Sequence, residues 1–173
     1  VPLITEPFSL NDNFDVLRNS YDDVMNFVVA ELDEAAGLLP LERSSSERGR
    51  VTKGAALGIK SRALLRMASP LNNPGNERSK WQAAADAAKA VIDLNLYSLY
   101  PDYGELFREE GNFNNEVIWE RVIDNQKVRT MGIERDLFPN GFGGWAVCVP
   151  TQRQVDAYET ANGLYINEDP SYD

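Results

Sequence analysis

The chain has 173 residues, of which 43% are hydrophobic and 25% are charged, and this composition is typical of a globular protein. Its net charge of −10 argues against a surface built to neutralise the phosphates of nucleic acid or an anionic lipid surface. Histidine is absent, which excludes a Ser-His-Asp or Cys-His nucleophile and any His-ligated metal within this chain. The single Cys148 excludes an internal disulfide and a multi-thiolate metal site. We therefore expect no metal and no cofactor.

The N-terminus begins Val1-Pro2-Leu3, without an initiator Met, a basic segment or a long apolar segment. We therefore expect a mature or excised chain rather than a natural N-terminus. Apolar runs fall well short of the roughly 20 residues that a helix needs to span a bilayer. We therefore expect any membrane association to depend on an anchor that has been removed.

The first predicted helix covers about 20–39. Ser20 is a predicted N-cap, and Asp23 follows it three residues later in the first turn. Pro40 ends the helix. Residues at spacings of three and four form one apolar stripe, which we expect to be buried. They are Tyr21, Val24, Val28, Leu32, Ala35 and Leu39.

The second predicted helix covers about 53–68, after the N-cap Thr52. It is rich in Gly and Ala, and small side chains permit the close approach of a neighbouring helix. Gly58 costs about 1 kcal/mol of helix propensity relative to Ala, so we expect a packing reason for it.

The third predicted helix covers about 80–93, and Ser79 with Gln82 forms a predicted capping box at its start. We expect its buried stripe to consist of Trp81, Ala85, Ala88 and Ile92.

Charge is segregated along these helices. Residues 1–39 carry eight acidic residues and one basic residue, whereas residues 40–82 carry three acidic and nine basic residues. The first two helices are therefore expected to form an antiparallel pair that attracts across its polar edges, at a few tenths of a kcal/mol per ion pair.

The later part of the chain is less periodic. Residues 116–123 are β-branched and aromatic, which predicts one short strand or hairpin. Residues 124–150 show no period and are expected to form a long loop. Thr151 and Gln154 then predict a short helix over about 151–159. The whole pattern indicates a mainly α fold in a single domain, 1–173.

Two catalytic or nucleotide-binding interpretations are disfavoured. Residues 141–146 match a G-x-G-x-x-A pattern, but the strand and helix that a dinucleotide site requires are not predicted around it. Asp156 with Glu159, or Asp102 with Glu105, resembles the carboxylate pair of a glycosidase. Both pairs lie beside predicted helix caps, so capping and solubility explain them better.

The candidate ligand site is in the long loop. An aromatic ring held among glycines, beside amide and guanidinium groups, offers a stacking face for the apolar side of a sugar and donors for its hydroxyls. The alternative is that Trp145 packs into the core, and the sequence does not decide between the two. The candidate ligand-binding residues are Trp145, Phe142, Asn140, Arg129, Asn72 and Asn73.

Several segments resemble, in the same order, the SusD/RagB family of outer-membrane nutrient-binding lipoproteins of Bacteroidetes. The first is Gly49-Arg50-Val51-Thr52-Lys53-Gly54-Ala55-Ala56, followed by Lys60-Ser61-Arg62-Ala63-Leu64-Leu65 and Ala68-Ser69-Pro70-Leu71. The others are Lys80–Ile92, Tyr97–Tyr103, Asn115–Ile118, Pro150–Gln152 and Val155–Glu159. The resemblance covers most of residues 20–173. Family members are considerably longer than this chain.

The resemblance implies a scaffold of helix pairs similar to tetratricopeptide repeats (TPR-like), with long loops. It implies capture of an oligosaccharide or other nutrient and its delivery to a TonB-dependent (SusC-like) transporter, without catalysis. It also implies a lipid anchor, absent from this chain, at the external face of the outer membrane. The alternative function is a helical protein-interaction module with no small-molecule site.

Overall fold

The computed structural model describes residues 1–108, 111–121 and 135–172. Internal contacts divide the chain into two compact units, Val1–Val122 and Ile123–Asp173. The expectation of a single domain over 1–173 stays a prediction. The described residues are mainly helical, as the sequence predicts. Among their helices, none is both long enough and apolar enough to cross a membrane.

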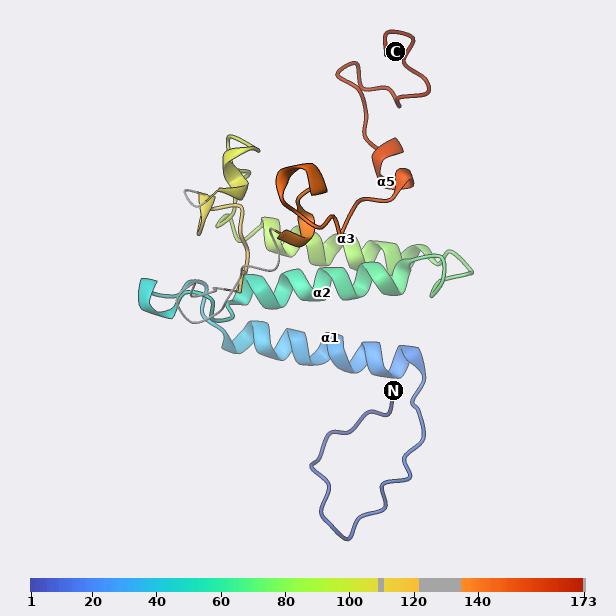
Figure 1. Ribbon diagram of the computed structural model, residues 1–173. Helices are drawn as coiled ribbons and strands as arrows, with labels where there is room; N and C mark the ends of the chain where they lie inside the picture. The colour runs from blue at the N-terminus through green and yellow to red at the C-terminus, as the bar shows by residue number, and fades with distance from the viewer. Residues whose placement is uncertain (109–110, 122–134, 173) are drawn as a thin grey trace. The chain divides into compact units, whose positions relative to one another are not determined.

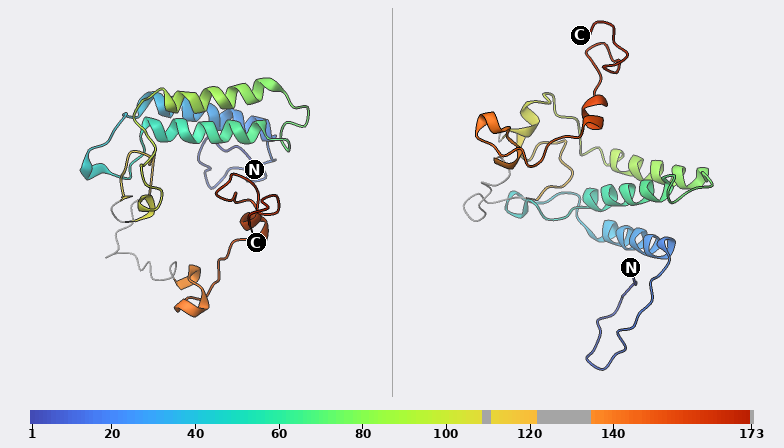
Figure 2. Two further views of the ribbon diagram at one scale, coloured as in Figure 1. Left: turned by 90° about the horizontal axis from the view of Figure 1, so that it is seen from above. Right: turned by 45° about the vertical axis from the view of Figure 1, so that its right-hand side comes forward.

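Three helices build the first unit: α1 (Tyr21–Leu38), α2 (Lys53–Ala68) and α3 (Arg78–Ile92). Figures 1 and 2 show them side by side and alternating in direction, with α2 in the middle. Consistent with this order, α2 contacts both α1 and α3. Each helix begins and ends within two residues of its predicted range.

The caps of α1 and α2 agree with the sequence patterns. Ser20 Oγ accepts a hydrogen bond from Asp23 N at 3.0 Å, and Thr52 Oγ1 accepts one from Ala55 N at 3.4 Å. The helix α3 differs, because it begins at Arg78 and its N-cap, Glu77, makes no side-chain cap bond. The predicted capping box at Ser79 is therefore wrong.

The core of the three helices consists mostly of small side chains. The buried hydrophobic residues are Ala36 in α1, Ala55, Ala56, Met67 and Ala68 in α2, and Ala84 and Ala87 in α3. Such residues let neighbouring helix backbones approach closely. The predicted stripe of α3 is wrong by about one position, because Trp81, Ala85 and Ile92 are exposed and Ala88 is half-buried. The alanines at 84 and 87 face the core in their place.

The predicted strand is also wrong over 116–121, where the structure contains no strand; residues 122 and 123 lie outside the described residues. A strand needs a neighbouring strand to accept and donate its backbone hydrogen bonds. Here a few isolated contacts hold the segment instead. Ser98 N donates to Asn115 O at 3.1 Å, and Tyr100 N donates to the Glu116 carboxylate at 2.7 Å.

The second unit contains the short helix α5 (Gln152–Asp156) and the 3₁₀ turn η4 (Asn140–Phe142). Two further 3₁₀ turns, η1 (Ser45–Glu47) and η2 (Glu105–Phe107), belong to the first unit. The helix α5 is shorter than the predicted 151–159. Ala157 and Tyr158 make tight turn bonds, and Glu159 then enters an isolated antiparallel bridge with Tyr165.

Candidate functional site

The segment of residues 135–148, here called the Trp145 loop, carries the predicted aromatic site within the second unit. Backbone hydrogen bonds join its two arms. Trp145 N donates to Arg135 O at 2.7 Å, and Val147 N donates to Asp136 O at 2.8 Å. The backbone on either side of the indole is therefore held in a fixed position, although the sequence showed no periodic element here.

Glycines make the turn at the tip of the Trp145 loop possible. Gly143 adopts a left-handed conformation with φ of 80°, directly after η4, and non-glycine residues adopt this conformation only at an energetic cost. Gly144 is buried against Phe138, and a Cβ added there would overlap the Phe138 carbonyl group. The glycine-rich sequence is thus required by the turn geometry, and the turn determines where Trp145 emerges.

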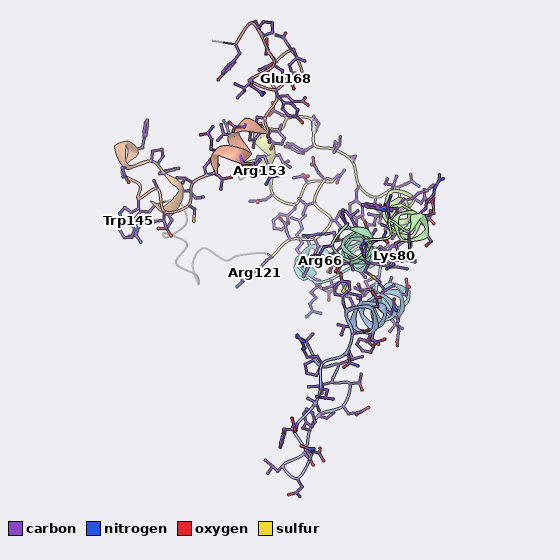
Figure 3. All side chains as sticks on the ribbon, turned by 90° about the vertical axis from the view of Figure 1, so that its right-hand side faces the viewer. Arg66, Lys80, Arg121, Trp145, Arg153 and Glu168 are labelled. Atoms are coloured by element: carbon purple, nitrogen blue, oxygen red, sulfur yellow. The ribbon has the colours of Figure 1, made fainter. Side chains whose placement is uncertain are left out.

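The Trp145 side chain is 58% exposed, so the structure places it at the surface rather than in the core. Figure 3 shows Trp145 on its loop. The guanidinium carbon of Arg135 lies 3.7 Å from the centroid of the indole ring. A cation at this distance over an indole contributes about 0.5–1 kcal/mol at an exposed site. Arg135 therefore helps to orient the ring while much of the ring stays open to solvent.

Two of the other predicted residues lie on the same loop. Phe142 is 83% exposed. The Asn140 side-chain amide lies beside two carbonyl groups of the loop, and with Nδ2 turned toward them it donates to Gly144 O at 3.0 Å and to Trp145 O at 3.3 Å. The structure thus brings together Trp145, Phe142 and Asn140, and Asn140 also stabilises the turn.

Asn72 and Asn73 belong to the first unit, just after α2. Asn72 is half-buried, and its Nδ2 donates to Arg66 O at 3.0 Å. Asn73 is only 2% exposed. Its Oδ1 accepts from Glu77 N at 2.9 Å, and its Nδ2 donates to Glu77 O at 3.2 Å and to Ala68 O at 3.4 Å. Asn73 therefore stabilises the connection between α2 and α3, and the function proposed below does not include it.

The guanidinium group of the site differs from the predicted one. Arg129 was the predicted donor, and it lies outside the described residues. Arg135, which the sequence reasoning missed, is the arginine on the indole. The available signal was the presence of a second arginine in the same non-periodic segment, since Arg commonly stacks on Trp.

Asp169 is the centre of a separate polar cluster near the C-terminus. Its buried carboxylate accepts hydrogen bonds from the Ser171 hydroxyl at 2.7 Å, the Thr160 hydroxyl at 2.5 Å and Ser171 N at 2.9 Å. These bonds hold the pKa of Asp169 well below its ordinary value of 3.8, and the bond from the Ser171 hydroxyl has the largest effect. Asn162 adds a further bond to the same carboxylate. The cluster fixes the chain from residue 160 to residue 171.

Groups of three or more acidic or thiol side chains suited to holding a metal ion are absent from residues 1–108, 111–121 and 135–172.

This chain is similar to a curated protein sequence and to solved structures. A SusD-like protein of Formosa agariphila is 26% identical over 147 residues, which are 82% of this chain and 26% of the relative. The solved structure of a SusD-like protein from Bacteroides fragilis has a TM-score of 0.70 and 24% identity, over 94% of this chain and 31% of that chain. A surface glycan-binding protein from Bacteroides uniformis has a TM-score of 0.49 and 24% identity, over 65% of this chain and 25% of that chain.

This chain spans about a quarter of the length of the curated relative that it matches. No protein-family profile matches it. The sequence match covers most of this chain, and the solved SusD-like structure has the same mainly helical fold. Sequence and fold together therefore confirm the predicted resemblance of this chain to the SusD-like proteins.

Proposed function

We propose that this chain is the part of a SusD-like protein that contributes to binding an oligosaccharide at the cell surface, without catalysis. The observation that carries the proposal is the exposed, oriented indole of Trp145, with Arg135 over its ring and Phe142 on the same loop. A pyranose presents an apolar C–H face that stacks on such a ring, and its hydroxyls accept hydrogen bonds from a guanidinium group.

The proposed contacts follow from this arrangement. The sugar stacks on the part of the Trp145 ring that Arg135 leaves open, and the guanidinium N–H groups donate to hydroxyls at the rim of the ring. Phe142 extends the apolar surface toward a neighbouring sugar unit. An exposed stacking contact contributes about 1 kcal/mol, so we expect modest affinity for each sugar unit.

The cellular setting is also part of the proposal. The resemblance to SusD-like proteins supports a lipid-anchored location at the external face of the outer membrane, with delivery of the glycan to a TonB-dependent (SusC-like) transporter. This step rests on the resemblance.

The direct test is a screen of the chain on an array of plant, microbial and animal oligosaccharides, followed by calorimetric titration with the strongest ligand. We expect Trp145→Ala to weaken binding by about fivefold, because it removes the stacking surface. The melting temperature should stay nearly unchanged, because the side chain is exposed. Trp81→Ala is the matched control, since it removes an exposed indole of the first unit and should leave the affinity unchanged.

Three results would contradict the proposal. A large fall in the melting temperature of Trp145→Ala would identify the ring as a packing residue. No glycan binding, together with tight binding of a protein partner, would favour a helical interaction module. Turnover of a chromogenic glycoside that is lost in Asp156→Asn or Glu159→Gln would indicate a glycosidase.

A further inference from the structure

A hollow of about 230 Å³ lies within the first unit, separate from the Trp145 loop. Three segments surround it: the α1–α2 connection from residue 41 to residue 52, residues 96–97, and residues 113–120. Its volume is below the roughly 300–1,000 Å³ of sites that hold drug-sized ligands, so it is suited to a single small ring. We call it the Trp119 pocket.

Trp119 supplies a fixed aromatic wall to this pocket. Its Nε1–H donates to Gly49 O at 2.9 Å, which joins two parts of the chain 70 residues apart. The side chain is nevertheless 49% exposed. Because the hydrogen bond fixes the polar edge of the indole, the ring offers its apolar surface without losing rotamer freedom when a ligand binds.

The pocket also carries polar groups of the kinds that recognise hydroxyls. The guanidinium carbon of Arg48 lies 4.3 Å from the centroid of the Phe113 ring, which is a second aromatic group of the same pocket. The exposed side chain of Asn115 and the half-buried carboxylate of Glu120 also line it. A guanidinium group donates hydrogen bonds, a carboxylate accepts them and an amide does both. These groups can therefore bond to a sugar hydroxyl both as donor and as acceptor.

The backbone around the pocket is held in place independently of any ligand. Arg43 donates from Nε and from a terminal nitrogen to Val51 O, both at 3.2 Å, and this closes the α1–α2 connection. Ser98 N donates to Asn115 O at 3.1 Å, which holds the opposite wall. A preorganised site loses less conformational entropy on binding, which matters most for a weakly held ligand.

We propose that the Trp119 pocket is a second carbohydrate subsite, which binds one pyranose ring by stacking on Trp119 and by hydrogen bonds to Arg48, Asn115 and Glu120. The inference rests on the proposed function for its class of ligand, but its residues are different. A glycan-binding chain with two subsites on separate units gains avidity for a polymer that offers many identical rings.

The test uses the indole N–H signals in a ¹H–¹⁵N spectrum, because the chain has three tryptophans and each gives one such signal. Single substitutions assign the signals. The ligands are the methyl β-pyranosides of glucose, galactose, mannose and xylose, each titrated into the millimolar range. We expect at least one of them to shift the Trp119 signal saturably in the unaltered chain and in Trp145→Ala. The Trp81 signal is the internal control and should not move.

A second variant tests whether the sugar binds in the Trp119 pocket, without removing the aromatic wall of the pocket. Asn115→Ala keeps the backbone bond from Ser98, so the fold should be unchanged, and the loss of one hydrogen bond should raise the Kd at the Trp119 signal about fivefold. The inference is overturned if no methyl glycoside moves the Trp119 signal, or if Asn115→Ala leaves its Kd unchanged. A shift of the Trp119 signal without any shift at Trp145 would contradict the proposed Trp145 site and support this inference.

Discussion

At the scale of single residues, an asparagine can either bind a ligand or stabilise the fold, and its neighbouring groups determine which of these it does. Asn73 and Asn140 were both predicted to contact a ligand because an amide beside turn residues suits hydroxyl recognition. The structure shows Asn73 buried between two helix ends and bonded to Ala68 and Glu77. No feature of the printed sequence distinguishes it from Asn72, whose side chain is half-buried.

Asp169 gives a prediction for the acid range. Its pKa is lowered in the folded chain by hydrogen bonds that only the carboxylate can accept, first from the Ser171 hydroxyl and then from Thr160. The associated stability is therefore fully present above the ordinary pKa of 3.8, and it is lost as the pH falls below 3.8 toward the folded pKa. An NMR titration of the Asp169 carboxyl carbon and the Ser171 amide should follow this loss.

The matched variant for this titration is Ser171→Ala, which removes the hydroxyl donor and keeps the backbone donor. We expect it to move the pKa of Asp169 back toward 3.8. A carboxyl group that titrates at 3.8 or above in the unaltered chain would contradict the hydrogen-bonded cluster.

At the scale of elements, helix ends were predictable where a side chain caps the backbone locally. Ser20 and Thr52 act as predicted, because a cap depends on residues three positions away and not on the rest of the fold. For the segment 116–121, the sequence predicts apolar character correctly but not the backbone conformation. A strand requires a partner from elsewhere in the chain, and the segment instead meets residues 98–100 through isolated bonds to Asn115 and Glu116.

The opposite charges of the first two helices correspond to one specific contact. Lys60 Nζ of α2 lies 2.5 Å from Asp33 Oδ1 of α1. The Asp33 side chain is half exposed, so this ion pair contributes at most about 1 kcal/mol to stability. Its main effect is on which edge of α1 lies against α2.

The glycines of α2 give a prediction at the same scale. The sequence predicts a packing role for Gly58, but a Cβ there would meet only Ile118 Cγ2, at an ordinary 3.8 Å. At Gly54 a Cβ would overlap the Tyr97 hydroxyl and ring. We therefore expect Gly54→Ala to lower the free energy of unfolding by about 1–3 kcal/mol, and Gly58→Ala to raise it by up to about 1 kcal/mol. Urea unfolding measures both changes.

Removing the neighbour tests the cause. In a Gly54→Ala background, Tyr97→Ala should cost less than it costs in the unaltered chain, because the overlap is relieved. Equal costs in the two backgrounds, or a destabilising Gly58→Ala, would show that the crowding is not at Gly54.

At the scale of the whole molecule, most of the buried apolar side chains in the three-helix layer are small, and several large apolar side chains are exposed. Leu65 and Ile92 are 53% and 72% exposed, whereas Met67 on α2 is buried. Hollows lined by these exposed side chains run along α2 and between α2 and α3. Exposed apolar surface of this kind binds hydrophobic dyes.

We therefore expect the folded chain to enhance the fluorescence of anilinonaphthalene sulfonate. The double variant Leu65→Ser, Ile92→Ser should reduce that fluorescence and change the free energy of unfolding by no more than about 0.5 kcal/mol per site. Met67→Ser, in the same helix, should instead cost about 2 kcal/mol or more, because that side chain is buried. A large destabilisation by the double variant would place these side chains in a core.

Periodicity, caps and ordered motifs are properties of neighbours in the chain, so the three helices, the acidic and basic sides of the first pair and the resemblance to SusD-like proteins could all be predicted from the residues alone. The folded chain was needed to show that Trp145 is exposed with Arg135 on its ring, that Asn73 is buried, and that Trp119 closes a pocket against Gly49. The contact of Trp119 joins residues 70 positions apart, and local residue preferences carry no information about such a contact.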